Sequence, residues 1–274
     1  MSDRPQKNLS EQKRAPFYAA LGRCLRRRGL RLEQICQLDD AVSRRVLEEY
    51  GAMFVAADCV RVPPACVFKS AVEVEAFQRE ATFLAAAFDS DELELQPAAM
   101  TALLRARDEA RVAGLDVTPR GGAEAARRSY DDTLRLWDSR FLPALEYWGA
   151  QENRLPPEQI ERLRSLSPAE QVPAVLELEA EGIFFSKDFS KSVLRSVAAP
   201  GTSQHLSMLA VDVTEFRETA MREILARHGW FQTVLGDLPH FTFLGLEEHE
   251  LPARGLRQSV DAGGDQTFWT PDVG

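Results

Sequence analysis

Long apolar runs, cysteine motifs and histidines are scarce in this sequence. No apolar stretch approaches the ~20 residues that a membrane-spanning helix needs, and no internal repeat or low-complexity tract is present. The chain has 4 cysteines but no C-x-x-C pair, so a zinc ribbon or a thioredoxin-like motif is not indicated. It also has only 4 histidines, which makes each of them easy to assess as a ligand or catalytic group.

The composition is that of a globular protein with a sizeable core. Of 274 residues, 45% are hydrophobic and 27% are charged, which allows one large domain or two small ones. The net charge is −9, but residues 1–50 are basic overall and the remainder is strongly acidic. A general phosphate-binding surface is therefore not expected beyond the N-terminus, and nucleic acid is not an expected partner. The short run Arg26–Arg28 is typical of a solvated helix face, and the oligomeric state stays open.

The four cysteines lie in the first quarter of the chain, at Cys24, Cys36, Cys59 and Cys66. Cys59 and Cys66 flank two prolines, whose bend could bring the two thiols together. Two interpretations remain open: a Cys59–Cys66 disulfide, or four buried thiols.

The hydrophobic pattern predicts an α+β protein with a mainly helical N-terminal part, residues 1–96, and a small antiparallel sheet in the second half. The strand candidates rich in β-branched and aromatic residues are Ile183–Phe185, Leu209–Val213 and His240–Leu244, with an amphipathic helix between the last two that ends near His228. The alternating segment Leu115–Thr118 is also predicted to be a strand. The tail around Phe268 is a candidate edge strand. The pattern also predicts a helix over Val72–Phe88. The short apolar runs Met53–Ala56 and Cys66–Phe68 are further strand candidates.

Two of these segments carry residues with metal-binding chemistry. His205 precedes the first strand, Asp212 lies on it, and His240 begins the second strand. Adjacent strands would bring two imidazoles and one carboxylate together, which leaves a fourth position open, as in catalytic zinc sites. Asp237, three residues before His240, could then act as a general base. On spacing alone the alternative is a turn-capping His205 and a hydrogen-bonded core His240.

The local sequence resembles a known family. Residues 203–212, SQHLSMLAVD, resemble the SxHxxGxAxD signature of the zinc D-alanyl-D-alanine carboxypeptidases and dipeptidases, peptidase family M15. Residues 237–240, DLPH, are similar to that family's ExxH motif. The looser resemblance begins near residue 97. It predicts a peptidase domain over 97–274 with a helical insertion near 123–181, and it leaves residues 1–96 unexplained.

The resemblance implies a site and a reaction. Zn²⁺ would be bound by His205, Asp212 and His240, and Asp237 would be the catalytic base. The expected activity is hydrolysis of D-Ala-containing peptidoglycan stem peptides or D-Ala-D-Ala-type dipeptides by a metal-activated water. An arginine that follows a strand is expected to bind the substrate carboxylate or the oxyanion.

Two further site residues follow from this resemblance. Arg120, after the segment Leu115–Val117, is the candidate for the arginine, with Arg127 and Arg128 as rivals. Ser203 is a candidate substrate-binding residue, or alternatively a turn cap.

The sequence departs from the family pattern at two positions. Met208 stands where the family usually has glycine, and Asp237 replaces a glutamate with a side chain one methylene shorter. These departures keep a second hypothesis open, a catalytically impaired zinc-containing module that binds peptidoglycan. A third is a helical interaction protein whose function lies in residues 17–96.

The predicted location follows from the substrate class. No secretory signal peptide is visible, because the basic start runs into Ala15–Leu21 without an apolar stretch or cleavage site. We therefore expect a periplasmic or cell-envelope protein whose leader is absent from this chain, with a cytoplasmic location as the alternative.

Overall fold

The computed structural model describes residues 15–152, 154–261 and 266–274, in two compact units. The first unit is formed by residues up to Cys66 together with Ala76–Arg128 and Gln204–Gly274, and the second by Val67–Glu75 and Ser129–Ser203. Helices and small antiparallel sheets are both present, which confirms the predicted α+β class. The predicted division into residues 1–96 and 97–274, with an insertion near 123–181, stays a prediction.

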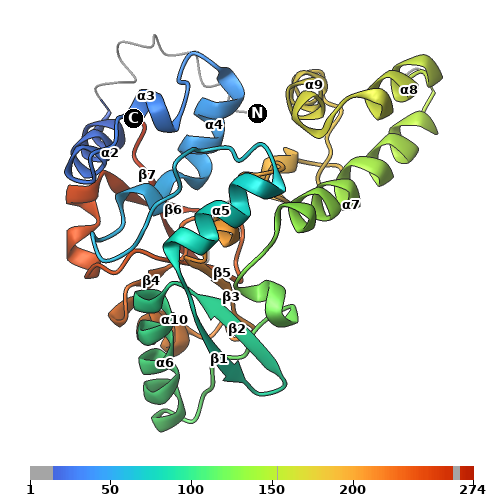
Figure 1. The fold of residues 1–274 in the computed structure, drawn as a ribbon. Coiled ribbons are helices and arrows are strands. Elements are labelled where there is room, and N and C mark those ends of the chain that lie inside the picture. Colours follow the sequence, from blue (N-terminus) through green and yellow to red (C-terminus); the bar gives the residue numbers. More distant parts are fainter. Residues whose placement is uncertain (1–14, 153, 262–265) are drawn as a thin grey trace. The chain divides into compact units, whose positions relative to one another are not determined.

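The first unit combines helices with three small sheets (Figure 1). Its elements are α2 (Pro16–Arg27), α3 (Leu32–Ile35), α4 (Ala41–Tyr50), η1 (Gly51–Val55), β1 (Leu84–Phe88), β2 (Asp91–Leu95), α6 (Pro97–Val112), η2 (Gly122–Ala125), η4 (Gln204–Ser207), β3 (Ala210–Asp212), α10 (Thr219–Arg227), β4 (Trp230–Phe231), β5 (His240–Phe243), η5 (Glu248–Glu250), η6 (Pro252–Arg254), β6 (Leu256–Val260) and β7 (Thr267–Pro271). Helix α5 (Ala71–Ala81) crosses the boundary between the two units.

A three-stranded sheet in the order β3-β5-β4 lies at the centre of this unit (Figure 1). Both β3 and β4 pair antiparallel with β5, whose four residues are all buried. Helix α10 connects β3 to β4 and packs against α6. In β5 the polar residues His240 and Thr242 alternate with Phe241 and Phe243, so a slip of one residue would exchange the polar and the apolar face, which fixes the register.

The strongest sequence predictions for this region are confirmed. The segments Leu209–Val213 and His240–Leu244 form β3 and β5, and the amphipathic helix between them is α10, with His228 as its C-terminal capping residue. Phe268 lies in β7, which pairs with β6. Among the described residues, no helix has both the length and the apolar character that crossing a bilayer requires.

Four of the strand predictions are wrong. Met53–Ala56 largely falls in the 3-10 helix η1, and the segments Cys66–Phe68, Leu115–Thr118 and Ile183–Phe185 form no strand. Short apolar runs do not distinguish a strand from another buried segment, because both require continuous apolar residues. The predicted helix over Val72–Phe88 ends at Ala81, since Thr82 adopts a left-handed φ of 58° and the remainder pairs with β2 as strand β1.

The second unit is helical in its described part. It contains α7 (Tyr130–Gly149), α8 (Pro157–Ser165), α9 (Pro168–Ala180) and the short η3 (Val193–Arg195). Helix α9 begins after Ser167, where the Glu170 carboxylate accepts both the backbone N–H and the hydroxyl of Ser167. Trp137, Phe141 and Phe185 stack in the core of this unit.

The cysteines differ from both interpretations of the sequence. All four are free thiols; Cys24, Cys36 and Cys66 are buried and Cys59 is exposed. The thiol of Cys36 donates to the carbonyl of Ser43 at 3.2 Å, and the backbone N–H of Cys66 donates to the carbonyl of Ile35, the residue before Cys36, at 2.7 Å. The neighbour of Cys66 is therefore Cys36 rather than Cys59.

Candidate metal centre

Strand register brings together two of the three predicted ligands. In the β3–β5 pair, Asp212 lies directly opposite His240. Residues opposite each other in antiparallel strands project from the same face, with Cβ atoms about 4.5–5.5 Å apart. His205 comes from η4, the short 3-10 helix that leads into β3. One strand pair and the short 3-10 helix before it therefore bring the three candidate ligands together.

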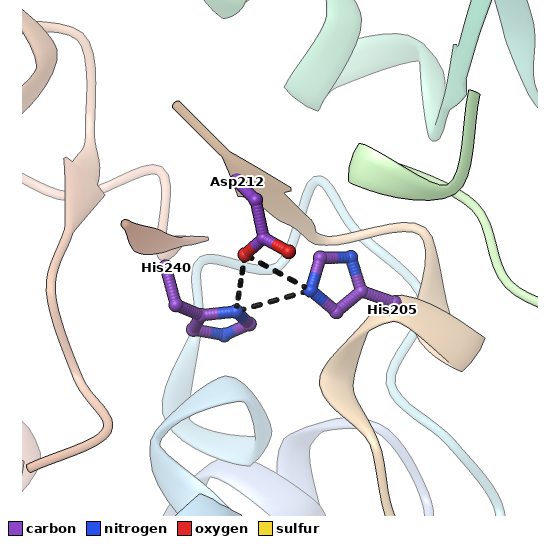
Figure 2. Close-up of side chains that lie close together, drawn as sticks. All are labelled: His205, Asp212 and His240. Carbon is purple, nitrogen blue, oxygen red and sulfur yellow. Dashed lines mark hydrogen bonds and ion pairs between the residues drawn. The ribbon is translucent and has the colours of Figure 1, made fainter. Parts of the chain in front are cut away.

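The three side chains point toward one another (Figure 2). His205 Nε2 lies 3.1 Å from His240 Nδ1 and 3.3 Å from Asp212 Oδ1, and His240 Nδ1 lies 3.2 Å from Asp212 Oδ1. The three atoms thus form a nearly equilateral triangle. His205 and His240 are buried, and Asp212 is partly buried.

The outer nitrogen of each imidazole shows which tautomer is present. His205 Nδ1 lies 2.9 Å from the carbonyl oxygen of Ala126, and His240 Nε2 lies 2.8 Å from Oε1 of Gln204. Both partners are acceptors, so each outer nitrogen carries the proton and donates it. The inner nitrogens of the neutral rings, His205 Nε2 and His240 Nδ1, therefore present lone pairs to each other.

This donor set fits a small divalent cation. Two nitrogen lone pairs and a carboxylate oxygen face one another at 3.1–3.3 Å, with no proton between the rings to bridge them. Tetrahedral ligands at about 2.0–2.1 Å from zinc are separated by about 3.3–3.4 Å, close to the spacing seen here. Burial lowers the pKa of His205 to about 4, and the charge of Arg128 lowers it as well, which keeps this ligand neutral near pH 7.

The second oxygen of Asp212 is held by an arginine. Arg128 Nη2 donates to Asp212 Oδ2 at 2.7 Å, and its Nε donates to the carbonyl of Glu124 at 3.0 Å. The positive charge of Arg128 favours the ionised form of Asp212. Asp212 is therefore a carboxylate with one oxygen directed into the cluster and the other fixed outside it.

Asp237 lies in the turn before β5, where its carbonyl accepts the backbone N–H of His240 at 3.3 Å. Part of this residue's surface is exposed to solvent. The protein around it still desolvates the carboxyl group and thereby raises its pKa, and the charge of Asp212 raises the pKa too. Over the described part of the chain, this carboxylate has no hydrogen-bond or ion-pair partner. It is an accessible proton acceptor within electrostatic range of His240.

Of the three candidate arginines, two lie beside Asp212. The backbone N–H of Arg120 donates to the carbonyl of Asp212 at 2.8 Å, and its exposed guanidinium lies over the ring of Phe216. Arg128 contacts the Asp212 carboxylate directly, as described above. Arg127 is instead paired with Glu94, at 2.5 Å. Ser203 is buried at the end of the second unit, and its predicted role stays a prediction.

The other two histidines lie outside the cluster. His228 caps α10, and its Nε2 lies 2.8 Å from the carboxylate of Glu109. His249 is exposed and lies 3.2 Å from Glu247. Neither is placed to contribute to the candidate metal centre.

Met208 adopts the backbone conformation that glycine favours. Its φ is 56° and its side chain is fully buried. A left-handed conformation costs a non-glycine residue about 1–2 kcal/mol. Met208 therefore holds this turn at the expense of local strain.

This strain predicts that glycine at position 208 is more stabilising than alanine, the reverse of the usual order. Both Met208→Ala and Met208→Gly lose the buried side chain, but only glycine relieves the left-handed strain. We expect Met208→Gly to be more stable than Met208→Ala by about 0.5–1 kcal/mol after allowing for the flexibility of glycine in the unfolded chain. Urea unfolding of both variants measures the difference. An alanine variant that equals or exceeds the glycine variant would contradict it.

Sequence reasoning missed Gln204 entirely and offered Arg128 only as a rival. Both contact a ligand side chain. Gln204 directly precedes His205, but nothing in its type or spacing distinguishes it from a surface glutamine. These contacts depend on the tertiary structure, so no local pattern signals them.

Comparisons with known proteins give little support of their own. No family model and no curated protein matches this chain. Among solved structures, it is similar to a mutant of the vancomycin-resistance D,D-pentapeptidase VanY, from a VanB-type resistance cassette, in complex with Zn(II). The match has 17% identity and a TM-score of 0.34, and covers 61% of this chain and 82% of that one. So low a score carries no argument, and the interpretation rests on the geometry above.

Proposed function

We propose that this chain is a zinc metallopeptidase that hydrolyses D-Ala-containing peptidoglycan stem peptides or D-Ala-D-Ala-type dipeptides. The observation that carries the proposal is the triangle of His205 Nε2, His240 Nδ1 and Asp212 Oδ1, which faces two lone pairs and a carboxylate toward one point. The substrate class is inferred from the resemblance of residues 203–212 and 237–240 to the M15 signatures. One line of support is therefore the geometry of the side chains, and the other is the sequence pattern around them.

Zinc is the metal that this donor set suits best. Two imidazoles and one carboxylate are its usual ligands in hydrolases, and three protein ligands leave a position for water or substrate. When bound there, the metal would supply Lewis acidity for a scissile carbonyl and lower the pKa of a water molecule. Asp212, with one oxygen held by Arg128, would offer the other as a ligand in a fixed orientation.

The remaining chemistry is assigned to residues around the cluster. Asp237 would accept a proton from the attacking water and deliver it to the leaving amine, because its carboxylate is accessible and has no partner. Arg120 would bind the terminal carboxylate of the peptide, since its guanidinium is exposed beside β3. Arg128 would keep Asp212 in place. Ser203 remains a candidate for a hydrogen bond to the substrate.

Metal analysis tests the first step of this proposal. After purification in the presence of zinc and removal of excess metal, the protein should retain about one equivalent. His240→Ala should lose it, whereas His249→Ala, which removes an exposed histidine outside the cluster, should not. Less than about a tenth of an equivalent in the unaltered protein would overturn the proposal. Release of D-Ala from a purified pentapeptide muropeptide then tests the substrate class.

A catalytically impaired module that binds peptidoglycan is the second candidate. The observations that favour it are the shorter carboxylate at Asp237 and the strained Met208 next to the cluster. Such a module would bind zinc and sediment with insoluble peptidoglycan, but would release no D-Ala. Zinc content together with D-Ala release therefore separates the two candidates.

The proposed substrate class places the protein in the periplasm or cell envelope. A dipeptidase acting on free D-Ala-D-Ala-type dipeptides would instead work in the cytoplasm. Fractionation of cells that express the full-length protein at its natural level would distinguish these locations.

A further inference from the structure

We infer that Gln204 is a positioning residue that fixes which nitrogen of His240 faces the metal centre. The inference rests on the proposed function, because it concerns the same site. It adds a residue that the M15 resemblance does not mark as functional and that touches neither substrate nor the point where the ligands converge. Gln204 is almost fully buried, and its amide contacts the outer nitrogen of the His240 ring.

The amide of Gln204 uses all of its hydrogen-bonding capacity. Its Nε2 donates to the carbonyl of Tyr50 at 2.7 Å and to Thr233 Oγ1 at 3.4 Å. Its Oε1 accepts from the Thr242 hydroxyl and lies 2.8 Å from His240 Nε2. A primary amide offers two protons and two acceptor sites, so none is left unsatisfied in this buried position.

The directions of these hydrogen bonds are mutually consistent. Thr242 donates to Gln204 Oε1, so the 2.6 Å contact between the two threonine hydroxyls is a donation from Thr233 to Thr242. Thr233 in turn accepts from Gln204 Nε2, which closes a ring of three hydrogen bonds. Rotating the amide by 180° would place Oε1 against the Tyr50 carbonyl, and two acceptors with no proton between them repel each other. The amide orientation is therefore determined by its surroundings.

This orientation determines the tautomer of His240. An amide oxygen facing Nε2 requires that nitrogen to carry the ring proton, which leaves the lone pair on Nδ1. Nδ1 is the atom that lies 3.1 Å from His205 Nε2 and 3.2 Å from Asp212. Gln204 thus prepares His240 as a ligand before any metal binds, as the Ala126 carbonyl does for His205.

The same network gives a role to the N-terminal region. Tyr50 is the last residue of α4, and its carbonyl is the acceptor that holds the Gln204 amide. Nearby, the backbone N–H of Ala57 donates to the carbonyl of Leu244, just after β5, at 2.7 Å. The end of α4 therefore belongs to the support of the metal centre, although the family resemblance does not reach it.

The test replaces Gln204 by methionine, which keeps the length of the side chain and removes its hydrogen bonds. In metal-free protein, ¹⁵N NMR of the histidine rings should show His240 protonated at Nε2 in the unaltered chain and a mixture of tautomers in Gln204→Met. Zn²⁺ affinity, measured by competition with a chromophoric chelator, should fall about 10–100-fold. Gln204→Glu, whose carboxyl group can still accept from His240, should recover most of that affinity.

Gln96→Met is the matched control. Gln96 is also a buried glutamine that bonds backbone groups, those of Arg61 and Ser207, but it touches no ligand side chain. The Gln96→Met variant should be less stable than the unaltered chain but should keep the zinc affinity and the His240 tautomer. Unchanged zinc affinity in Gln204→Met would overturn the inference.

A result from the unaltered chain decides the case if Gln204→Met does not fold. Protonation of His240 at Nδ1 in the metal-free protein would overturn the inference without any variant. If instead the unaltered chain shows the expected tautomer but binds no zinc, the proposed function fails while the role of Gln204 in fixing the ring stands.

Discussion

Replacing Asp237 by asparagine should slow D-Ala release by about 10²–10⁴-fold and leave the zinc content unchanged. Asparagine has nearly the same shape as aspartate but cannot accept a proton. Asp237 is suited to general-base chemistry because its carboxylate is accessible, has no partner among the described residues and has a raised pKa. A pKa closer to neutrality makes a carboxylate a stronger base while it is still ionised near pH 7.

The measurement is the initial rate of D-Ala release from a pentapeptide muropeptide, with zinc quantified in the same sample. Asp138→Asn is the matched control, because burial also raises the pKa of that aspartate, which lies in α7. Full activity in Asp237→Asn would assign the base to another group.

The variant Asp237→Glu separates an efficient enzyme from an impaired one. It restores the longer carboxylate of the family motif. If the unaltered chain releases no D-Ala and Asp237→Glu does, the chain is an impaired module whose defect is the position of its base. A rate that falls or stays the same in Asp237→Glu indicates that the structure already accommodates the shorter side chain.

The convergence of the three candidate ligands was predictable from sequence because it depends on local rules. His240 begins a strand and Asp212 ends one, and antiparallel pairing of two adjacent strands places such residues opposite each other. His205 precedes the first of these strands by a short turn, so it is brought near by chain continuity. Spacing alone left a turn-capping His205 and a core His240 as the alternative, and the resemblance of the two short motifs to a zinc peptidase signature favoured a metal site.

The support of the centre was not predictable, since it depends on residues distant in sequence. Gln204 is held by Tyr50, and Arg128 reaches Asp212 across 84 positions of the chain. Neither contact follows from periodicity. The left-handed φ of Met208 is a further case, because methionine is not a residue whose presence suggests that conformation. Sequence therefore indicated which atoms could bind a metal, and the structure shows what orients them.

Removing the charge of Asp212 should destabilise the metal-free protein by about 3 kcal/mol. The Arg128–Asp212 pair is 2.7 Å long, and the two side chains are only 17% and 14% exposed. Asp212→Asn leaves the Arg128 charge largely buried without a counter-charge. Urea unfolding in the presence of a chelator measures the loss. Glu161→Gln is the control, since Glu161 is 74% exposed in its pair with Arg164 and should contribute about 0.5 kcal/mol or less.

A double-mutant cycle shows whether the loss comes from the pair. Arg128→Met removes the unpaired cation, so Asp212→Asn combined with Arg128→Met should be more stable than the sum of the single losses by about 2 kcal/mol. Strict additivity would mean that Arg128 turns to solvent and does not fix Asp212. Because Arg128 occupies Oδ2, it leaves Oδ1 as the oxygen directed at the two imidazoles. The coupling energy therefore measures how firmly this ligand is oriented before a metal binds.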